Sequence, residues 1–320
     1  MPGVTGEEAA PVRGPAGPEA GRSRPVGHLA ELAASCNHGR VILDQTFRWN
    51  GRRIAWRATG EGPPLVFCHG TPWSSALWVP FADALARDFT VYLWDMPGYG
   101  VSSKESDHKV DLGVQGEVFS SLLTHWGLAR PHVVAHDYGG AVSLRAHLLH
   151  GRPFASLCLV DVVALRPWGS AFFTLVKENA DIFMRLPAAV HQGALQAYIA
   201  GASHRGLRPG AAEMLAAPWA DDKGRAAFYR QIAQADERYT HELEPHLASI
   251  SAPTHIIWGE DDTWIPADRA RRLQESIPGS TLTVIPEAGH LIQLDAPVAL
   301  MADLQRWLLT QIKSPDGGTS

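Results

Sequence analysis

Short apolar runs alternate with segments of helical periodicity through most of the chain. Six runs rich in aliphatic and aromatic residues predict buried strands: PLVFCHG, FTVYLWD, PHVVAHD, ASLCLVDVV, PTHIIWGEDD and STLTVIPEAGH. Apolar residues at helical spacing predict helices near residues 74–86, 112–126, 139–150, 267–276 and 297–311. This alternation predicts an α/β fold in which helices flank a mostly parallel sheet.

Two segments depart from the alternation. VILDQTFRW and RRIAWRATG flank the turn signal Asn50-Gly51, which predicts a β-hairpin. Residues 166–247 lack a convincing strand and carry helical patterns over residues 172–184, 189–202 and 224–235. We therefore expect a helical cap, residues 166–247, inserted into a core formed by residues 36–165 and 248–312.

The two ends of the chain read as unstructured. Residues 1–35 are rich in Pro, Gly, Ala and Arg and cannot bury enough surface to offset their ordering entropy, so we expect a disordered leader. Residues 313–320 are expected to form a flexible tail. Acids and prolines stand where a signal peptide needs an apolar stretch, and no run is long enough to span a bilayer. We expect a cytoplasmic protein without a membrane partner.

Charge and cysteine content narrow the classes of function. The formal net charge is −5 and no dense basic cluster is present, so nucleic acid is not an expected partner. Cys36, Cys68 and Cys158 are scattered, and the last two lie in apolar runs where a thiol acts as a small core residue. We expect no disulfide scaffold, no metal site and no cofactor. The oligomeric state stays open.

The segment AHDYGG, residues 135–140, directly follows an apolar strand and opens an amphipathic helix. Small residues around one reactive side chain allow a sharp turn from strand to helix, which exposes that side chain at the carboxyl edge of a sheet. The reactive position is Asp137, where the usual form of this turn carries serine. An alternative is that Asp137 only caps the helix.

An aspartate at this position suits displacement at saturated carbon. A serine that attacked such a carbon would form an ether that water cannot cleave, whereas a carboxylate forms an ester open to a second attack. HGTP, residues 69–72, ends an earlier strand, where a turn can aim backbone N–H groups at the same crevice. The N–H groups of Tyr138 and near Thr71 are the expected oxyanion hole.

The candidate base is His290, in the loop PEAGH after the strand STLTVI. Its ordinary pKa near neutrality suits deprotonation of a water. Asp262 follows the strand HIIW and is the favoured acid to orient the imidazole, and Asp161, at the end of SLCLV, is the alternative. The order nucleophile, acid, histidine supports a functional role over a structural one.

These motifs resemble the α/β-hydrolase superfamily, within it the Asp-nucleophile branch of epoxide hydrolases and haloalkane dehalogenases. The resemblance covers about residues 40 to 312 through HGTP, DMPGYGVSS, HDYGG, GEDDTWIP and EAGH. Haloalkane dehalogenases typically have Asn where this chain has Thr71 and Trp where it has Tyr138, so both halide donors are missing. Fluoroacetate dehalogenases place arginines at the positions of Tyr138 and Ala141, which argues against haloacids.

Epoxide hydrolases use two cap tyrosines to protonate the leaving alkoxide. Tyr229 resembles the second, although it can equally be a core residue of an amphipathic helix. No tyrosine stands at the expected position of the first, and Tyr198 comes later. A leaving group that needs less protonation, such as the nitrogen of an already protonated aziridine, fits this shortage.

The sequence thus predicts a hydrolase that takes a small hydrophobic organic substrate and water. Asp137 displaces a leaving group to form an alkyl ester, and His290 with Asp262 directs water onto it. The expected substrate is a strained three-membered ring, an epoxide or aziridine, with a detoxification role as a hypothesis. One alternative is a haloalkane dehalogenase in which Trp168 or Trp264 replaces the missing halide donor. Another is a non-catalytic binding protein that keeps the fold.

Overall fold

The computed structural model describes residue 3 and residues 43–313, so the expected leader, most of the tail and the first residues of the core lie outside the described part. An eight-stranded sheet forms the centre, in the order β1-β2-β4-β3-β5-β6-β7-β8. The strands are β1 (Gln45–Trp49), β2 (Arg52–Thr59), β3 (Pro64–Cys68), β4 (Thr90–Trp94), β5 (His132–His136), β6 (Ser156–Val160), β7 (Thr254–Gly259) and β8 (Thr281–Ile285). β1 and β2 form the expected antiparallel hairpin, β2 pairs antiparallel with β4, and all other pairings are parallel.

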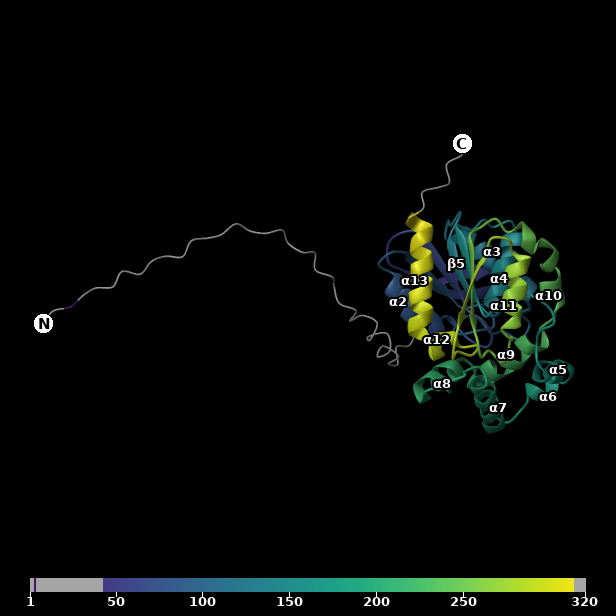
Figure 1. Cartoon of the computed structure of the whole chain (residues 1–320). Helices are drawn as coiled ribbons and strands as arrows, with labels where there is room; N and C mark the ends of the chain where they lie inside the picture. Colours follow the sequence, from purple (N-terminus) through teal and green to yellow (C-terminus); the bar gives the residue numbers. More distant parts are fainter. Residues whose placement is uncertain (1–2, 4–42, 314–320) are drawn as a thin grey trace.

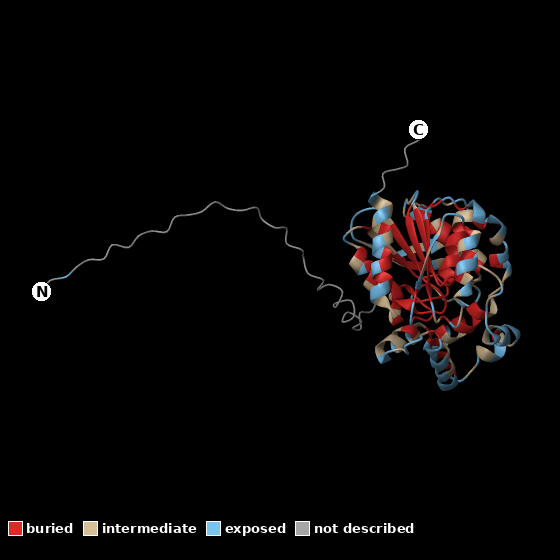
Figure 2. Ribbon diagram, in the orientation of Figure 1, coloured by how far each residue is buried: buried red, intermediate tan, exposed pale blue. Residues whose placement is uncertain are grey.

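Alternate residues of the central strands feed two hydrophobic clusters, one on each face of the sheet. In β5, Val133 and Ala135 join one cluster while Val134 joins the other, as the two-residue period of a strand requires. Helices cover both faces, and only their outer surfaces are exposed (Figures 1 and 2). They are η1 (Ser75–Trp78), α2 (Val79–Leu85), α3 (Leu112–His125), α4 (Tyr138–Leu148), α11 (Asp268–Ser276), α12 (Ile292–Asp295) and α13 (Pro297–Lys313).

A run of helices lies between β6 and β7 in sequence, and we call it the helical insertion. Its elements are α5 (Ala171–Glu178), α6 (Ala180–Phe183), α7 (Ala188–Ala200), α8 (Pro209–Ala216), η2 (Ala217–Trp219), α9 (Asp222–Ala233), α10 (Arg238–His241) and η3 (Glu244–Ser249). In Figure 1 its helices α5 to α9 lie below the sheet, and α10 lies at the right, beside α11.

The insertion differs in detail from the helices that the sequence predicts. The expected helix over residues 172–184 is interrupted at Asn179, whose backbone leaves the helical region with φ −132° and ψ 31°. Its side-chain amide donates to the carbonyl of Leu175, a local bond that competes with helix continuation. The sequence analysis also missed α8, which begins at Pro209, a residue favoured in a first helical turn.

The parallel strands end at one edge of the sheet, which is where their following loops must lie. β3, β5, β6, β7 and β8 pair in register with their carboxyl ends side by side. HGTP, Asp137, Asp161, Asp262 and His290 all follow these strands. The topology therefore gathers every candidate catalytic residue of the core at one edge.

Candidate active site

The turn between β5 and α4 holds Asp137 in a strained backbone conformation. Its φ of 51° and ψ of −119° are unusual for a residue with a side chain. The following helix approaches neighbouring strands closely: a Cβ on Gly139 would lie 2.5 Å from the carbonyl oxygen of Cys68, and one on Gly140 2.3 Å from the Cβ of Val162. The glycines of HDYGG are therefore required by close approach.

One oxygen of Asp137 is bound by the HGTP loop. The backbone N–H of Thr71 donates to its Oδ1 at 2.6 Å, and a Cβ on Gly70 would lie 2.4 Å from the Asp137 Cβ. His69 fixes this loop, because its Nδ1 donates to the carbonyl of Gly70 and its Nε2 accepts from the N–H of Met96. The loop therefore presents an N–H donor at the nucleophile position.

A second N–H is available at the same turn. Tyr138 begins α4, and the first N–H groups of a helix have no partner within it. The Thr71 N–H therefore contacts the Asp137 carboxylate directly, while the Tyr138 N–H, next in sequence, is the second donor that the expected oxyanion hole would use.

The other oxygen of Asp137 faces His290. The Nε2 of His290 lies 3.5 Å from Asp137 Oδ2, and its Nδ1 lies 2.9 Å from Asp262 Oδ2. Asp262 Oδ1 accepts the backbone N–H groups of Trp264 and Ile265 at 2.7 and 2.9 Å. The three side chains are buried and form a continuous chain from carboxylate to imidazole to carboxylate.

Two carboxylates control the charge of His290. Burial alone would lower its pKa, but the charge of Asp262, the hydrogen bond to Asp262 and the close approach of the Asp137 carboxylate outweigh it and raise the pKa of His290 well above the ordinary value. The neighbouring His136, whose Nε2 donates to the carbonyl of His290, behaves oppositely: burial and the proximity of His290 lower its pKa to about 3. The surroundings of His290 thus favour its protonated form, and those of His136 favour its neutral form.

Asp161 lies behind the acid without binding His290. It follows β6 with a positive φ of 43°, and its Oδ1 accepts the N–H of Gly259 at 2.8 Å. Its Oδ2 is buried and has no hydrogen-bond partner in the described structure. Burial, reinforced by the charge of Asp262, raises the pKa of Asp161 well above its usual range. Of the two acids that the sequence left open, Asp262 is the one in contact with the imidazole.

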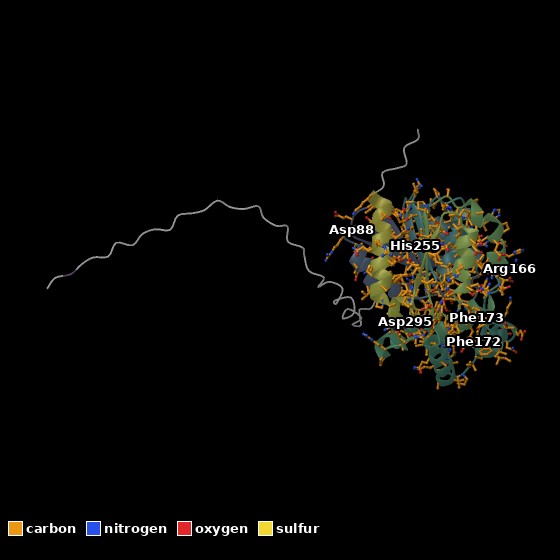
Figure 3. The ribbon with its side chains drawn as sticks, in the orientation of Figure 1. Asp88, Arg166, Phe172, Phe173, His255 and Asp295 are labelled. Carbon is orange, nitrogen blue, oxygen red and sulfur yellow. The ribbon has the colours of Figure 1, made fainter. Side chains whose placement is uncertain are left out.

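The loop that carries His290 is also bound to the helical insertion. Asp295 Oδ2 accepts the N–H of Gly289 and that of His204, both at 2.8 Å, and its Oδ1 accepts the hydroxyl of Ser203. The N–H of Leu291 donates to the carbonyl of Ala202. Figure 3 labels Asp295 where the core meets the insertion. The insertion therefore helps to hold the base in place.

Aromatic rings surround the catalytic groups. Trp264 stacks on His290 with ring centroids 5.1 Å apart, and Trp73 stacks on Trp264 at 5.6 Å. The ring centroid of Tyr198, in α7, lies 4.5 Å from that of Trp264 and 5.1 Å from that of Phe172. Phe172 is labelled in the insertion in Figure 3. These contacts join the insertion to the core beside the base.

Three tyrosines lie close enough to Asp137 to feel its charge. Burial is the main cause that raises the pKa values of Tyr138 and Tyr198 well above the usual range; the charge of Asp137 comes next for Tyr198, and for Tyr138 it follows the interaction with Tyr99. Tyr99 is affected similarly, and its hydroxyl donates to Gln231 Oε1 at 2.9 Å. The hydroxyl of Tyr138 is buried without a partner in the part of the chain described. The sequence analysis did not assign a role to the hydroxyls of Tyr138, Tyr198 or Tyr99.

The two predicted cap residues are engaged elsewhere. Tyr229 bonds through its hydroxyl to His191 Nδ1 at 3.0 Å, within the insertion, and burial raises its pKa to about 12. Trp168 packs edge-on against Tyr138, but its indole N–H donates to Thr240 Oγ1 at 2.8 Å. Trp168 therefore lies against Tyr138, but its indole N–H is already bound to Thr240. The hydroxyl of Tyr229 is bound to the ring of His191.

Two further properties of the described residues bear on function. No group of three or more His, Cys, Asp or Glu side chains among them is arranged to hold a metal ion. None of their helices combines the length and the apolar character needed to cross a membrane.

The family follows from comparison with known proteins. A model described as the alpha/beta hydrolase fold matches residues 63–297. The chain belongs to the α/β-hydrolase family. An α/β-hydrolase fold protein from Burkholderia ambifaria is 44% identical, with a TM-score of 0.82 over 84% of this chain and 100% of that one. This α/β-hydrolase is also similar to haloalkane dehalogenase 2 of Mycobacterium tuberculosis, at 27% identity over 78% of this chain and 89% of that protein.

Another relative of this α/β-hydrolase is larger. The dihydrolipoyllysine-residue acetyltransferase component of the acetoin cleaving system of Pseudomonas putida is 30% identical over 77% of this chain. The match spans 64% of that protein's length, so the likeness concerns only part of it. By its family and its relatives, the chain is an α/β-hydrolase-fold protein related to haloalkane dehalogenases.

Proposed function

We propose that this α/β-hydrolase cleaves its substrate at saturated carbon through an alkyl ester on Asp137. The observation that carries the proposal is the chain of contacts from Asp137 through His290 to Asp262, with Thr71 N–H on the remaining nucleophile oxygen. This set supplies a nucleophile, a base, an orienting acid and an oxyanion donor.

In the first step, Asp137 Oδ2 attacks the carbon and the bond to the leaving group breaks, so that the electron pair departs with that group. The carboxylate becomes a neutral ester. Because the charge of Asp137 helps to hold the proton on His290, ester formation lowers the pKa of the imidazole. The imidazole can then give its proton to the departed group or to solvent, and a neutral base is available for the second step.

In the second step, His290 Nε2 takes a proton from water, and the resulting hydroxide adds to the ester carbonyl carbon. Negative charge develops on Asp137 Oδ1, the oxygen that already accepts the N–H of Thr71 at 2.6 Å. Asp262 stabilises the imidazolium through Nδ1. When the intermediate collapses, the bond from the carbonyl carbon to the alcohol oxygen breaks and that oxygen takes the proton of the added hydroxyl, so the alcohol leaves, the carboxylate is restored and His290 keeps the proton from water.

The proposed substrate class is a strained three-membered ring, an epoxide or an aziridine. The oxygen of an epoxide leaves as an anion and needs a proton, and the phenols of Tyr138 and Tyr198, whose pKa values respond to the charge of Asp137, are the proposed donors. Their raised pKa values keep both phenols protonated at neutral pH. Tyr138 has no competing partner in the described structure, which supports its role as a donor.

Carbon–halogen hydrolysis is the second candidate, because haloalkane dehalogenase 2 of Mycobacterium tuberculosis is among the relatives. The site has fewer free donors for a departing halide, because the hydroxyl of Thr71 donates to Gln231 and the indole N–H of Trp168 donates to Thr240. A halide would have to be held by Tyr138 or Trp264.

The decisive experiment uses His290→Ala, which should form the ester and fail to hydrolyse it. The protein is incubated with epoxides, aziridines and haloalkanes and its intact mass is measured. An adduct on Asp137 that is absent from the His290→Ala/Asp137→Asn double variant would support the mechanism, and its mass would identify the substrate class. No adduct across the panel would favour a binding protein of the same fold.

A further inference from the structure

A cavity of about 440 Å³ lies away from the triad, between the hairpin, the loop after β4 and the start of α9. None of Asp137, Asp262 and His290 lines it. Its volume falls within the range of about 300–1,000 Å³ found for small-molecule sites. Its charged lining residues are Arg48, Arg53, Lys104, Glu105, Asp221 and Lys223.

The lining carries an excess of positive charge. Four of these side chains are cationic and two are carboxylates, on a chain whose formal net charge is −5. Both carboxylates are already engaged: Glu105 pairs with Lys223 at 2.5 Å, and Asp221 caps α9 by accepting the N–H of Gly224. Neither Arg48 nor Arg53 has a carboxylate partner among the described residues.

The cations crowd one another. Lys104 is half-buried and donates to the carbonyl of Gly100. Burial lowers its pKa, Asp95 and Asp221 raise it, and the charges of Arg53 and Lys223 lower it further. A bound anion would relieve this repulsion.

We propose that this cavity binds the phosphate group of a small phosphate monoester. Two excess positive charges match the charge of about −1.5 to −2 that such a group carries at neutral pH, and exceed what one carboxylate would neutralise. The guanidinium groups of Arg48 and Arg53 can donate hydrogen bonds to phosphate oxygens, Arg53 through the N–H groups that remain beside its bond to the carbonyl of Val101, and Lys104 supplies a point charge.

The cavity joins the core to the helical insertion, since Lys104 belongs to the core and Lys223 to α9. From it, contacts lead to the nucleophile. Arg230 donates to the carbonyl of Lys104, and the adjacent Gln231 accepts the hydroxyl of Thr71, whose N–H binds Asp137. A bound phosphate would therefore fasten the insertion to the core on the side of the oxyanion hole.

The test is calorimetric titration of the full chain with inorganic phosphate at constant ionic strength. Arg53→Ala is compared with Arg57→Ala, which removes the same charge from the same strand but lies outside the cavity and pairs with Asp83. We expect one saturable site in the wild type and in Arg57→Ala, and binding weaker by about tenfold or more in Arg53→Ala. No saturable binding, or equal loss in both variants, would overturn the proposal.

Hydrogen exchange gives a second, independent measurement. Phosphate should slow amide exchange in residues 101–105 and 218–224, on the two sides of the cavity, and binding without this protection would place the phosphate elsewhere. Melting curves without phosphate verify that each variant is folded. Neither measurement needs turnover, so a negative result leaves the hydrolytic mechanism untouched.

Discussion

At the scale of single residues, the charge of His290 depends on the carboxylate that it serves. Asp262 and Asp137 both hold a proton on the buried imidazole, and only Asp137 is consumed when an ester forms. Asp137→Asn imitates the charge of that ester. We expect the imidazole of His290 to titrate at lower pH in Asp137→Asn than in the wild type, as followed by NMR. An unchanged titration would mean that Asp262 alone sets the pKa.

A second prediction concerns the phenols near the nucleophile. Tyr138→Phe and Tyr198→Phe should each slow ring opening, and loss of a general acid costs about 10²–10⁴-fold in rate. Tyr229→Phe is the matched control, because its hydroxyl bonds to His191. Single-turnover measurement of ester formation tests this, and a larger effect of Tyr229→Phe would contradict the assignment.

Sequence reasoning located some of these residues better than others. Asp137, Asp262 and His290 follow predicted strands, so the topology of a parallel sheet is enough to bring them together. Tyr198 lies on a helix of the insertion, and its approach to Trp264 depends on how that helix packs. No local pattern encodes such packing, whereas Tyr229 was singled out by the resemblance to epoxide hydrolases.

At the scale of elements, the close packing of α4 on the sheet fixes the strained turn. Gly140→Ala would place a methyl group 2.3 Å from the Cβ of Val162 and should destabilise the fold by about 1–3 kcal/mol. Gly193→Ala, in the open middle of α7, should stabilise by up to about 1 kcal/mol. Denaturant unfolding of both variants provides the measurement, and equal effects would show that contact with Val162 is unimportant.

The strands were easier to predict than the insertion. β5 and β6 are fully buried and read as continuous apolar runs of β-branched and aliphatic residues, a strong signal. The insertion has short helices with mixed periodicity, and α8 is separated from α7 by a loop that carries no apolar pattern. Its helices are held by tertiary contacts, as the bonds from Asp295 illustrate, and a single sequence does not display those.

For the whole molecule, Asp161 should make stability depend on pH. Its pKa is raised in the folded state, so its contribution is fully present below the unfolded pKa of about 3.9 and is lost as pH rises through the folded value. In Asp161→Asn the side chain cannot titrate, so this pH-dependent loss of stability does not occur. The melting temperature of the variant should therefore gain on that of the wild type between pH 4 and pH 8, and a constant difference would contradict the shift.

The order of the catalytic parts along the chain has a consequence for synthesis. Thr71 and Asp137 leave the ribosome long before His290, and β7 and β8, which carry the acid and the base, are the last strands of the sheet. A prematurely terminated chain that ends within the insertion would contain the nucleophile and lack the means to regenerate it. Turnover would therefore require that the whole chain is translated and that β7 and β8 have joined the sheet.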